Sequence, residues 1–224
     1  MGLRIVILGG PGAGKGTQAM RIAEAREIPH ISTGAIFRGH MEQNTELGRA
    51  IRPYMDTGQL VPDDLTCRVV EQRLQQADCR NGYILDGFPR TLPQARTLDE
   101  LLDRRGDRLD VVIELDVPDD EIVDRLSARR TCPVCGKIFN LKFDPPSTDN
   151  SKCDRPECTG ELVTRPDDRE ETVRQRIRVY HETTQPILEY YRECGLLRSV
   201  NCDALAPEAV FVKVEEILCA VSAA

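Results

Sequence analysis

Short apolar runs alternate along the chain with longer segments of helical spacing. The runs are typical of buried strands and lie at residues 3–8, 82–86, 110–115 and 196–200. Apolar positions with a helical period cover residues 17–26, 63–77, 91–105, 119–130, 168–192 and 207–221. Strands that alternate with helices predict a parallel sheet with helices on both faces.

Two stretches interrupt this alternation. Residues 32–61 have a polar, helical pattern, whereas residues 131–164 are rich in Cys, Pro, Gly and Asp and show no helical period. We interpret both as insertions into an α/β core. The predicted division is a core of residues 1–31, 62–128 and 165–224, with insertions at 32–61 and 129–164.

Length and composition agree with a soluble globular protein. The 224 residues are 40% hydrophobic and 30% charged, which is enough to bury a full core. No apolar run approaches the roughly 20 residues of a membrane helix, and the first residues lack the long apolar core of an export signal. We therefore expect a cytoplasmic protein without membrane contact. The net charge of −7 argues against coating nucleic acid through a basic field.

Residues 9–17, Gly-Gly-Pro-Gly-Ala-Gly-Lys-Gly-Thr, match the spacing of a phosphate-binding loop between a strand and a helix. Glycines let backbone N–H groups turn toward a phosphate, and the following helix adds its positive end. Lys15 supplies a mobile charge for the terminal phosphates. The predicted phosphate-binding residues are Gly12, Ala13, Gly14, Lys15, Gly16 and Thr17. Gly16 stands where the general pattern has Ser or Thr.

The form of this loop, with Gly16-Thr17 after the lysine, resembles that of adenylate kinases. Other segments agree in order along nearly the whole chain: Ile31-Ser32-Thr33-Gly34 with Arg38, Gly58-Gln59-Leu60-Val61, Leu85-Asp86-Gly87-Phe88-Pro89-Arg90 with Gln94, Asp124-Arg125 with Arg129, and Arg165, Asp167, Asp168 and Arg176. The resemblance implies a P-loop NTPase core with a five-stranded parallel sheet flanked by helices. It further implies that residues 32–61 are a helical nucleoside-monophosphate-binding insertion and that residues 129–164 are a small zinc-binding lid.

The resemblance also implies roles for the charged residues. Asp86 ends an apolar strand, where its carboxylate can reach Mg²⁺ or its waters beside the phosphate loop. Arg38 and Arg90 would hold the AMP phosphate, and the remaining arginines of the motifs would close onto the ATP phosphates and the group in transfer: Arg125, Arg129, Arg165 and Arg176. Lys15, Asp86 and these arginines, apart from Arg38, form the predicted catalytic set. Stabilising clustered phosphates is most of the catalysis in phosphoryl transfer.

The nucleosides would be recognised by a second set of residues. Gln94 can donate to and accept from the adenine edge of AMP. The resemblance adds further residues of the AMP site: Thr33, Gln59, Leu60, Val61, Gly87, Phe88, Pro89, Arg165 and Arg176. Arg125 and Phe139, next to Ile138, are expected to sandwich the adenine of ATP. Ala35 departs from the family, which commonly has Asp there.

Four of the nine cysteines form the pairs Cys132-x2-Cys135 and Cys153-x4-Cys158. Four thiolates suit Zn²⁺ in a tetrahedral site, and four protein ligands leave no position open for catalysis. The spacing therefore predicts a structural zinc site. In similar lids the fourth ligand is two residues closer, where this chain has Pro156, so Cys158 is the expected substitute. We expect the other five cysteines to be apolar fillers and His30 and His181 to be ordinary loop and helix residues.

The leading hypothesis is the reaction Mg·ATP + AMP ⇌ 2 ADP, carried out by a monomer with ATP, AMP and ADP as its partners. A kinase for another monophosphate, UMP or CMP, is the enzymatic alternative. A P-loop GTPase should carry an Asn-Lys-x-Asp motif, which this chain lacks. A zinc-ribbon protein that binds nucleic acid is the remaining alternative, and the negative net charge argues against it.

Overall fold

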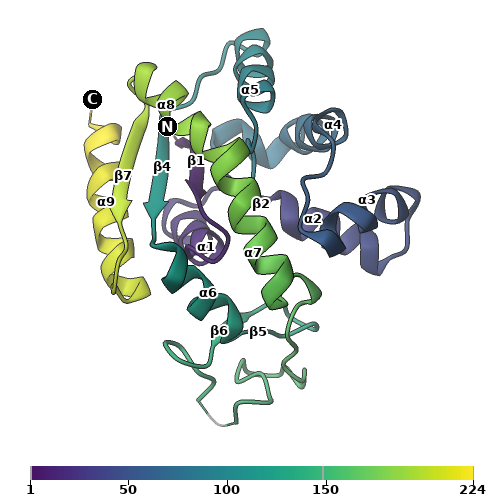
Figure 1. Cartoon of the computed structure of the whole chain (residues 1–224). Coiled ribbons are helices and arrows are strands. Elements are labelled where there is room, and N and C mark those ends of the chain that lie inside the picture. The colour runs from purple at the N-terminus through teal and green to yellow at the C-terminus, as the bar shows by residue number, and fades with distance from the viewer. Residues whose placement is uncertain (1, 148, 224) are drawn as a thin grey trace.

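A five-stranded parallel sheet forms the centre of the structure, a computed structural model that describes residues 2–147 and 149–223 (Figure 1). Its strands are β1 (Arg4–Gly9), β2 (His30–Ser32), β3 (Tyr83–Asp86), β4 (Val111–Asp116) and β7 (Leu197–Asn201), in the order β2-β3-β1-β4-β7. The register places Asp86 beside Ile7 of β1 and Ser32 of β2. The carboxyl ends of the three strands therefore meet at one edge, where α/β proteins bind their ligands.

Helices cover both faces of this sheet, as the sequence predicted. They are α1 (Lys15–Arg26), α2 (Thr33–Glu42), α3 (Glu46–Thr57), α4 (Asp63–Leu74), α5 (Leu92–Arg104), α6 (Asp119–Ser127), α7 (Glu170–Val179), α8 (Gln185–Glu193) and α9 (Pro207–Ser222). Short 3-10 turns cover Ala77–Asn81 and Pro166–Asp168, and a π-helical turn covers Tyr180–Thr184.

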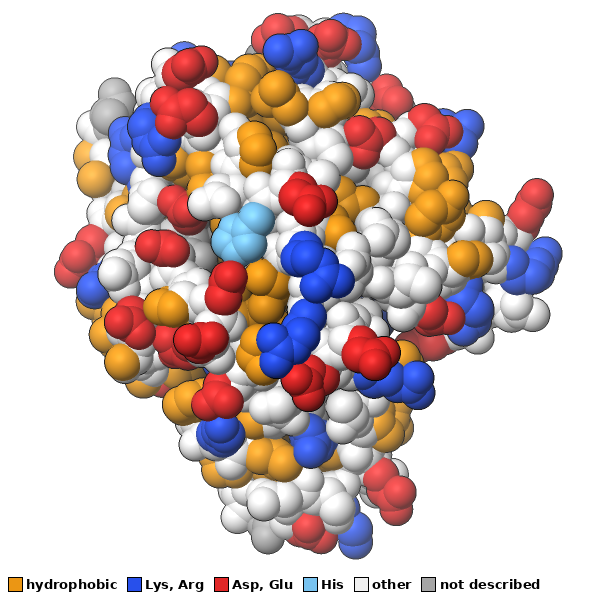
Figure 2. Space-filling model, viewed as in Figure 1, with side chains coloured by type: hydrophobic (Ala, Val, Ile, Leu, Met, Phe, Trp, Pro, Cys, Tyr) orange, Lys and Arg blue, Asp and Glu red, His pale blue; other side chains and the backbone are white. Residues whose placement is uncertain are grey.

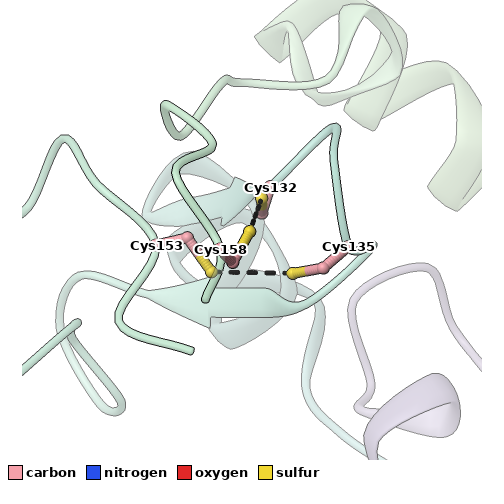
Figure 3. A group of neighbouring side chains, drawn as sticks. All are labelled: Cys132, Cys135, Cys153 and Cys158. Carbon is pink, nitrogen blue, oxygen red and sulfur yellow. Dashed lines mark hydrogen bonds between the residues drawn. The ribbon is translucent and has the colours of Figure 1, made fainter. Parts of the chain in front are cut away.

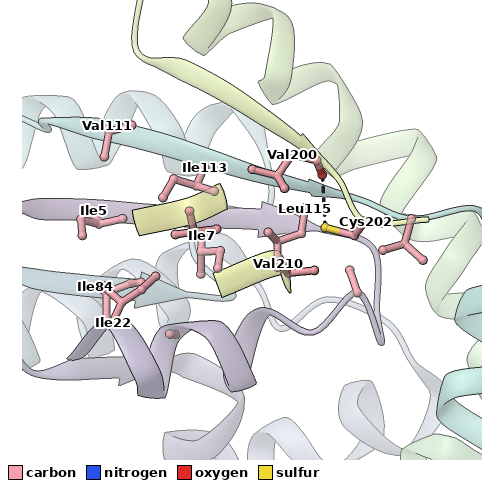
Figure 4. Packing of buried hydrophobic residues seen from close by; sticks show 14 of the residues in the cluster. Ile5, Ile7, Ile22, Ile84, Val111, Ile113, Leu115, Val200, Cys202 and Val210 are labelled. Atoms are coloured by element: carbon pink, nitrogen blue, oxygen red, sulfur yellow. Dashed lines mark hydrogen bonds between the residues drawn. The ribbon is translucent and has the colours of Figure 1, made fainter. Parts of the chain in front are cut away.

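Successive residues of the strands enter different cores. Ile5 and Ile7 of β1 pack with α1, α6, α7 and α9. Figure 4 shows part of this cluster, including Ile22 of α1 and Val210 of α9. Val6 and Leu8 of the same strand pack with α4, α5 and α8. Because side chains alternate across a strand and both sheet faces are covered, the strands read as continuous apolar runs.

The predicted elements differ from the observed ones in three places. Strand β2 was not predicted, because three residues are too short to show a period. The helical pattern at 168–192 is one helical run whose middle is the π-helical turn Tyr180–Thr184. The pattern at 119–130 ends as helix at Ser127, and the chain then enters the short strand β5 (Arg129–Thr131).

The two inserted stretches have small hydrophobic clusters of their own. In the first, Phe37 of α2 and Ile51 of α3 pack with Val61. In the second, β5 pairs in antiparallel register with β6 (Ile138–Asn140), and Phe139 packs against the cysteines. Figure 1 shows α2 and α3 projecting to one side of the sheet, and β5 and β6 beyond the ends of α6 and α7.

The surface and the helices add two observations. On the face shown in Figure 2, acidic and basic side chains are interspersed. Within residues 2–147 and 149–223, no helix combines the length and apolar character needed to cross a membrane.

Candidate active site and lid cysteine cluster

The predicted phosphate loop links β1 to α1. Gly9 has a φ of 143°, and a Cβ there would lie 2.5 Å from the carbonyl oxygen of Leu115, so the position requires glycine. Gly14 adopts the left-handed conformation with a φ of 94°, and Lys15 begins the helix. Gly12 and Ala13 precede this turn, and Gly16 and Thr17 lie in the first turn of α1. The N-terminus of a 12-residue helix therefore opens at the loop.

The Lys15 ammonium is held by the loop itself. Its Nζ donates to the carbonyl oxygens of Gly9 at 2.8 Å and Gly10 at 2.6 Å. Burial lowers the pKa of Lys15 to about 7, although the nearby Asp86 carboxylate acts in the opposite direction. Among the residues that the structure describes, no carboxylate therefore pairs directly with this ammonium, which lies beside the glycines.

Asp86 lies at the end of β3 beside the same loop. Burial favours its neutral form, but a 3.2 Å hydrogen bond with His30 Nε2 and the charge of Lys15 outweigh this effect and lower the pKa of Asp86. A Cβ on Gly16 would lie 3.5 Å from Asp86 Oδ2, which is an ordinary van der Waals contact. An ionised carboxylate beside a phosphate loop is an oxygen donor of the kind that Mg²⁺ prefers, so this position fits a magnesium nucleotide.

Five of the six predicted arginines lie close enough for their positive charges to interact: Arg38, Arg90, Arg129, Arg165 and Arg176. Burial is the main reason that the pKa falls to about 9 for Arg165 and about 10 for Arg176, and neighbouring guanidinium groups add to the effect. Crowding of buried like charges is unfavourable, and a bound polyanion relieves it.

Two acidic residues that follow the second insertion, Asp167 and Asp168, organise this arginine cluster. Asp167 accepts from Arg176 Nη1 at 2.7 Å, and the fully buried Asp168 accepts from Arg129 Nε at 2.8 Å and also from its Nη2. Burial disfavours the charge of Asp167, but Arg176 and its neighbours lower the pKa of this carboxyl overall. The acids therefore fix guanidinium groups in place without neutralising the whole cluster.

Two adjoining pockets open along the carboxyl edge of the sheet. One is lined by the phosphate loop and Lys15, and the other by Thr33, Arg38, Val61 and Gln94. Residues that line both pockets are Gly58, Leu60, Gly87, Arg90 and Arg176. Arg90 and Arg176 thus stand at the boundary between the two pockets.

The second pocket collects most residues predicted for AMP. Thr33 Oγ1 donates to the carbonyl oxygen of Gly87 at 2.9 Å, and Arg90 Nε donates to the same oxygen at 2.9 Å. Gln59, Leu60 and Val61 also line this pocket. Three predicted residues do not line this pocket. The Phe88 side chain is buried in the core against α4, α5 and α8, Pro89 lines the first pocket, and Arg165 donates from Nε to Thr131 Oγ1 at 2.8 Å.

The expected sandwich for the adenine of ATP is not formed in this structure. Phe139 is 1% exposed inside the lid, and Lys137 Nζ lies 4.5 Å from its ring centroid. Arg125 is held by Glu121 Oε1 at 2.6 Å and the carbonyl oxygen of Cys202 at 3.1 Å, and it lines neither pocket. Ile138 beside Phe139 is half-buried. The sequence missed this because aromatic character does not distinguish a lid core from a stacking surface.

The four lid cysteines converge as predicted (Figure 3). Their Sγ atoms all lie within 4.8 Å of one another, with 3.5 Å between Cys132 and Cys158 and 3.6 Å between Cys135 and Cys153. Zn–S bonds of about 2.3 Å would place the corners of a tetrahedron about 3.8 Å apart. The backbone N–H of Lys137 lowers the pKa of Cys135 to about 7, whereas burial raises the pKa of Cys153, so the fit to a metal rests on the positions of the sulfur atoms. The cluster therefore fits a four-coordinate zinc ion, and Cys158 lies where the extended spacing predicted.

The remaining cysteines only partly follow the prediction of apolar fillers. Cys79 and Cys202 are buried and Cys67 is half-buried, but Cys194 and Cys219 are exposed. The prediction was wrong for these two, because both lie near the solvent-facing ends of their helices.

Several functional candidates were not predicted. His30, expected to be an ordinary loop residue, lies in β2 and contacts Asp86. Asp63 accepts from the side chain of Gln94, and Glu121 holds Arg125. Asp167 and Asp168 are part of the motifs that carry the resemblance, but their contacts with Arg176 and Arg129 were not predicted. The sequence signal for these acids was their closeness to the arginine motifs, since Glu121 precedes Arg125 and Asp167 and Asp168 follow Arg165.

Comparison with known proteins agrees with this architecture. The family model described as "Adenylate kinase" matches residues 7–196. Relatives named adenylate kinase include those of Agathobacter rectalis, 52% identical with coverage of 89% of this chain and 92% of the relative, and of Archaeoglobus fulgidus, 49% identical with coverage of 96% and 98%. The relative from Acetivibrio thermocellus is 47% identical, with 98% of each chain covered. Since family model and relatives both span most of the sequence, this chain belongs to the adenylate kinase family.

Proposed function

We propose that the cleft described above transfers the terminal phosphoryl group of Mg-ATP to AMP, giving two ADP, and that its two pockets hold the two nucleotides. The observation that carries this assignment is the shared boundary: Arg90 and Arg176 line both pockets. A group that leaves one nucleotide and joins the other must cross such a boundary. Arg90 and Arg176 can contact the transferred group both before and after it crosses.

The first pocket suits ATP. Backbone N–H groups of the loop and the N-terminus of α1 bind phosphate oxygens, and Lys15 can turn from the carbonyl oxygens of Gly9 and Gly10 to a phosphate. Asp86 is placed to hold the magnesium ion or its waters. When bound, Mg²⁺ neutralises charge on the terminal phosphates of ATP.

The second pocket suits AMP. Arg38 and Arg90 face it with guanidinium groups whose pKa burial lowers, so an incoming phosphate regains favourable interactions. Gln94 is placed for the base, because its amide carries both donors and acceptors. This recognition favours AMP over UMP, because uracil carries an N–H at position 3 beside a carbonyl at position 4. Cytosine presents the same acceptor and donor as adenine, so the assay below separates AMP from CMP.

Transfer itself requires positioning and charge rather than a protein nucleophile. The bond between the terminal phosphorus and its bridging oxygen in ATP breaks as a phosphate oxygen of AMP bonds to that phosphorus. Arg176 lines both pockets, and the charge of Arg129 acts on both Arg165 and Arg176. We assign these three guanidinium groups to the charge that develops on the group in transfer. Arg125 would reach the ATP side only after it leaves Glu121.

The four lid cysteines would hold one structural Zn²⁺. The convergence of their Sγ atoms supports this assignment. The lid segment has a thin apolar cluster, so a metal crosslink would supply much of its folding free energy. No cysteine is assigned a chemical role.

A coupled assay tests the assignment. The chain should phosphorylate AMP in the presence of Mg-ATP, and kcat/KM for AMP should exceed that for UMP, CMP and GMP. Turnover of a pyrimidine monophosphate with higher kcat/KM than AMP would overturn the choice of acceptor.

A further inference from the structure

Gln94 is held at both ends of its side-chain amide. Its Oε1 accepts from the backbone N–H of Arg90 at 2.8 Å, and its Nε2 donates to Asp63 Oδ1 at 2.6 Å. The side chain is 1% exposed, and it forms part of the wall of the pocket that contains Thr33 and Arg38. The amide is therefore fixed before any base arrives.

These two partners determine which end of the amide is oxygen and which is nitrogen. A backbone N–H can only donate, and a carboxylate can only accept, so the oxygen must face Arg90 and the nitrogen must face Asp63. A flipped amide would set an NH₂ group against the N–H of Arg90 and an oxygen against the carboxylate. Both contacts would be repulsive.

Asp63 is itself held in place. Its second oxygen accepts from the Thr91 hydroxyl at 2.7 Å, and this hydroxyl accepts from the backbone N–H of Gln94 at 3.2 Å. Both oxygens of Asp63 are thus bound to the short segment 91–94, and rotation of the carboxylate would break both bonds. Asp63 begins α4, so a residue 31 positions before Gln94 in sequence sets the orientation of the Gln94 amide.

We propose that Asp63 is a positioning residue that makes the second pocket selective for adenine over the 6-oxopurines hypoxanthine and guanine. The inference rests on the base-reading role of Gln94 in the proposed function. The two contacts use one N–H and one lone pair of the amide, which leaves one N–H and one lone pair for the base. Adenine offers an acceptor at N1 beside a donor at N6, and this matches the fixed amide.

The 6-oxopurines invert this pattern. They carry an N–H at position 1 and a carbonyl at position 6, so they would pair with the flipped amide that Asp63 and Arg90 exclude. A paired hydrogen-bond match to a base edge typically contributes about tenfold or more to discrimination. Removal of Asp63 leaves only the Arg90 contact to resist the flip.

The test measures kcat/KM for AMP and for inosine monophosphate at saturating Mg-ATP, and compares the ratio between variants. Asp63→Ala should lower the AMP-to-IMP ratio by about tenfold, and Asp63→Asn, which keeps an acceptor for Gln94, should restore part of it. Asp64→Ala is the matched control, because it removes the neighbouring acidic residue of the same helix turn. This side chain is exposed, and within residues 2–147 and 149–223 its ion pair is with Arg68 alone, at 3.4 Å. Its ratio should equal that of the unaltered enzyme.

Partial misfolding of a variant does not change the AMP-to-IMP ratio, because the inactive fraction lowers both kcat/KM values by the same factor. Gln94→Ala is measured alongside. If it lowers the ratio and Asp63→Ala does not, the inference is overturned while the proposed function stands. If Gln94→Ala leaves the ratio unchanged, the base-reading role of Gln94 fails, and the inference fails with it.

Discussion

At the scale of a single residue, Lys15 is held by the phosphate loop and can turn from there to a bound phosphate. Its ammonium donates to two carbonyl oxygens of the phosphate loop. We expect Lys15→Ala to lower kcat by at least about 100-fold, because loss of one preorganised donor to a transition-state charge commonly has this effect. Arg21→Ala, on the exposed side of α1, should retain activity. Near-normal turnover of a folded Lys15→Ala protein would contradict the assignment of residues 9–17 as the phosphate-binding loop.

The lowered pKa of Lys15 has a measurable consequence for nucleotide binding. In the free enzyme burial brings the pKa to about 7, so above this pH the amine is mostly neutral. Bound phosphates favour the charged form and raise the pKa again. ATP binding should therefore take up a proton above pH 7, and its affinity should weaken as pH rises through about 7.

Calorimetry in buffers of different ionisation enthalpy measures this proton uptake directly. Lys15→Met provides the control, because it retains the titration of the nucleotide and removes that of the lysine. Equal uptake by the two proteins would show that another group titrates.

The two-pocket assignment predicts different kinetic defects for two arginines. Arg90 lines both pockets and lies beside Gly87, whereas Arg125 contacts the loop at the Ala13 carbonyl oxygen at 3.5 Å. Arg90→Ala should raise KM for AMP more than KM for ATP, and Arg125→Ala should do the reverse. Steady-state kinetics with each nucleotide varied in turn checks this, and identical changes in both constants would contradict the division.

At the scale of elements, the apolar pattern was sufficient for the longer strands and helices, because their burial on both sheet faces leaves a strong periodic signal. It failed for β2, whose three residues are fixed by pairing with β3. It also could not reveal the π-helical turn at Tyr180–Thr184, where the Thr184 hydroxyl donates to the Arg90 carbonyl oxygen at 2.9 Å. Both features depend on partners distant in sequence.

The lid is the element whose stability should depend on metal. Its apolar cluster consists largely of the cysteines themselves with Phe139 and Leu162. Cys158→Ser should therefore reduce zinc content, from about one ion per chain, and lower the melting temperature. Elemental analysis and thermal unfolding check this, with Cys194→Ser, an exposed cysteine outside the lid, as the control.

Phosphoryl transfer by Cys158→Ser should change only through the lid. Protein purified without chelator that holds no metal, with all four thiols freely titratable, would contradict the zinc assignment. The kinase assignment would remain, because the phosphate-binding residues lie elsewhere.

At the scale of the whole molecule, the glycine, arginine and cysteine motifs were enough to indicate a nucleotide cleft and a four-thiolate cluster. They could not indicate how the positive charge is balanced. Arg129 and Asp168 are 39 residues apart in sequence, and their contact depends on how the lid returns to the core. The buried position of Phe139 was hidden for the same reason, since the cluster that encloses it forms only in the folded lid.

The pairing at the base of the lid has a further consequence for the evolution of this chain. Thr131 and Val163 exchange two backbone hydrogen bonds of 2.9 Å, and Arg129 binds Asp168 just outside them. The polypeptide thus leaves the core and returns to it at adjacent, hydrogen-bonded residues. The entropy of closing a loop grows only slowly with its length, so insertions or deletions beyond this point change the cost of closure little. The sheet can accordingly tolerate lids of different lengths and cysteine spacings, such as the extended spacing that ends at Cys158, without any change in its own sequence.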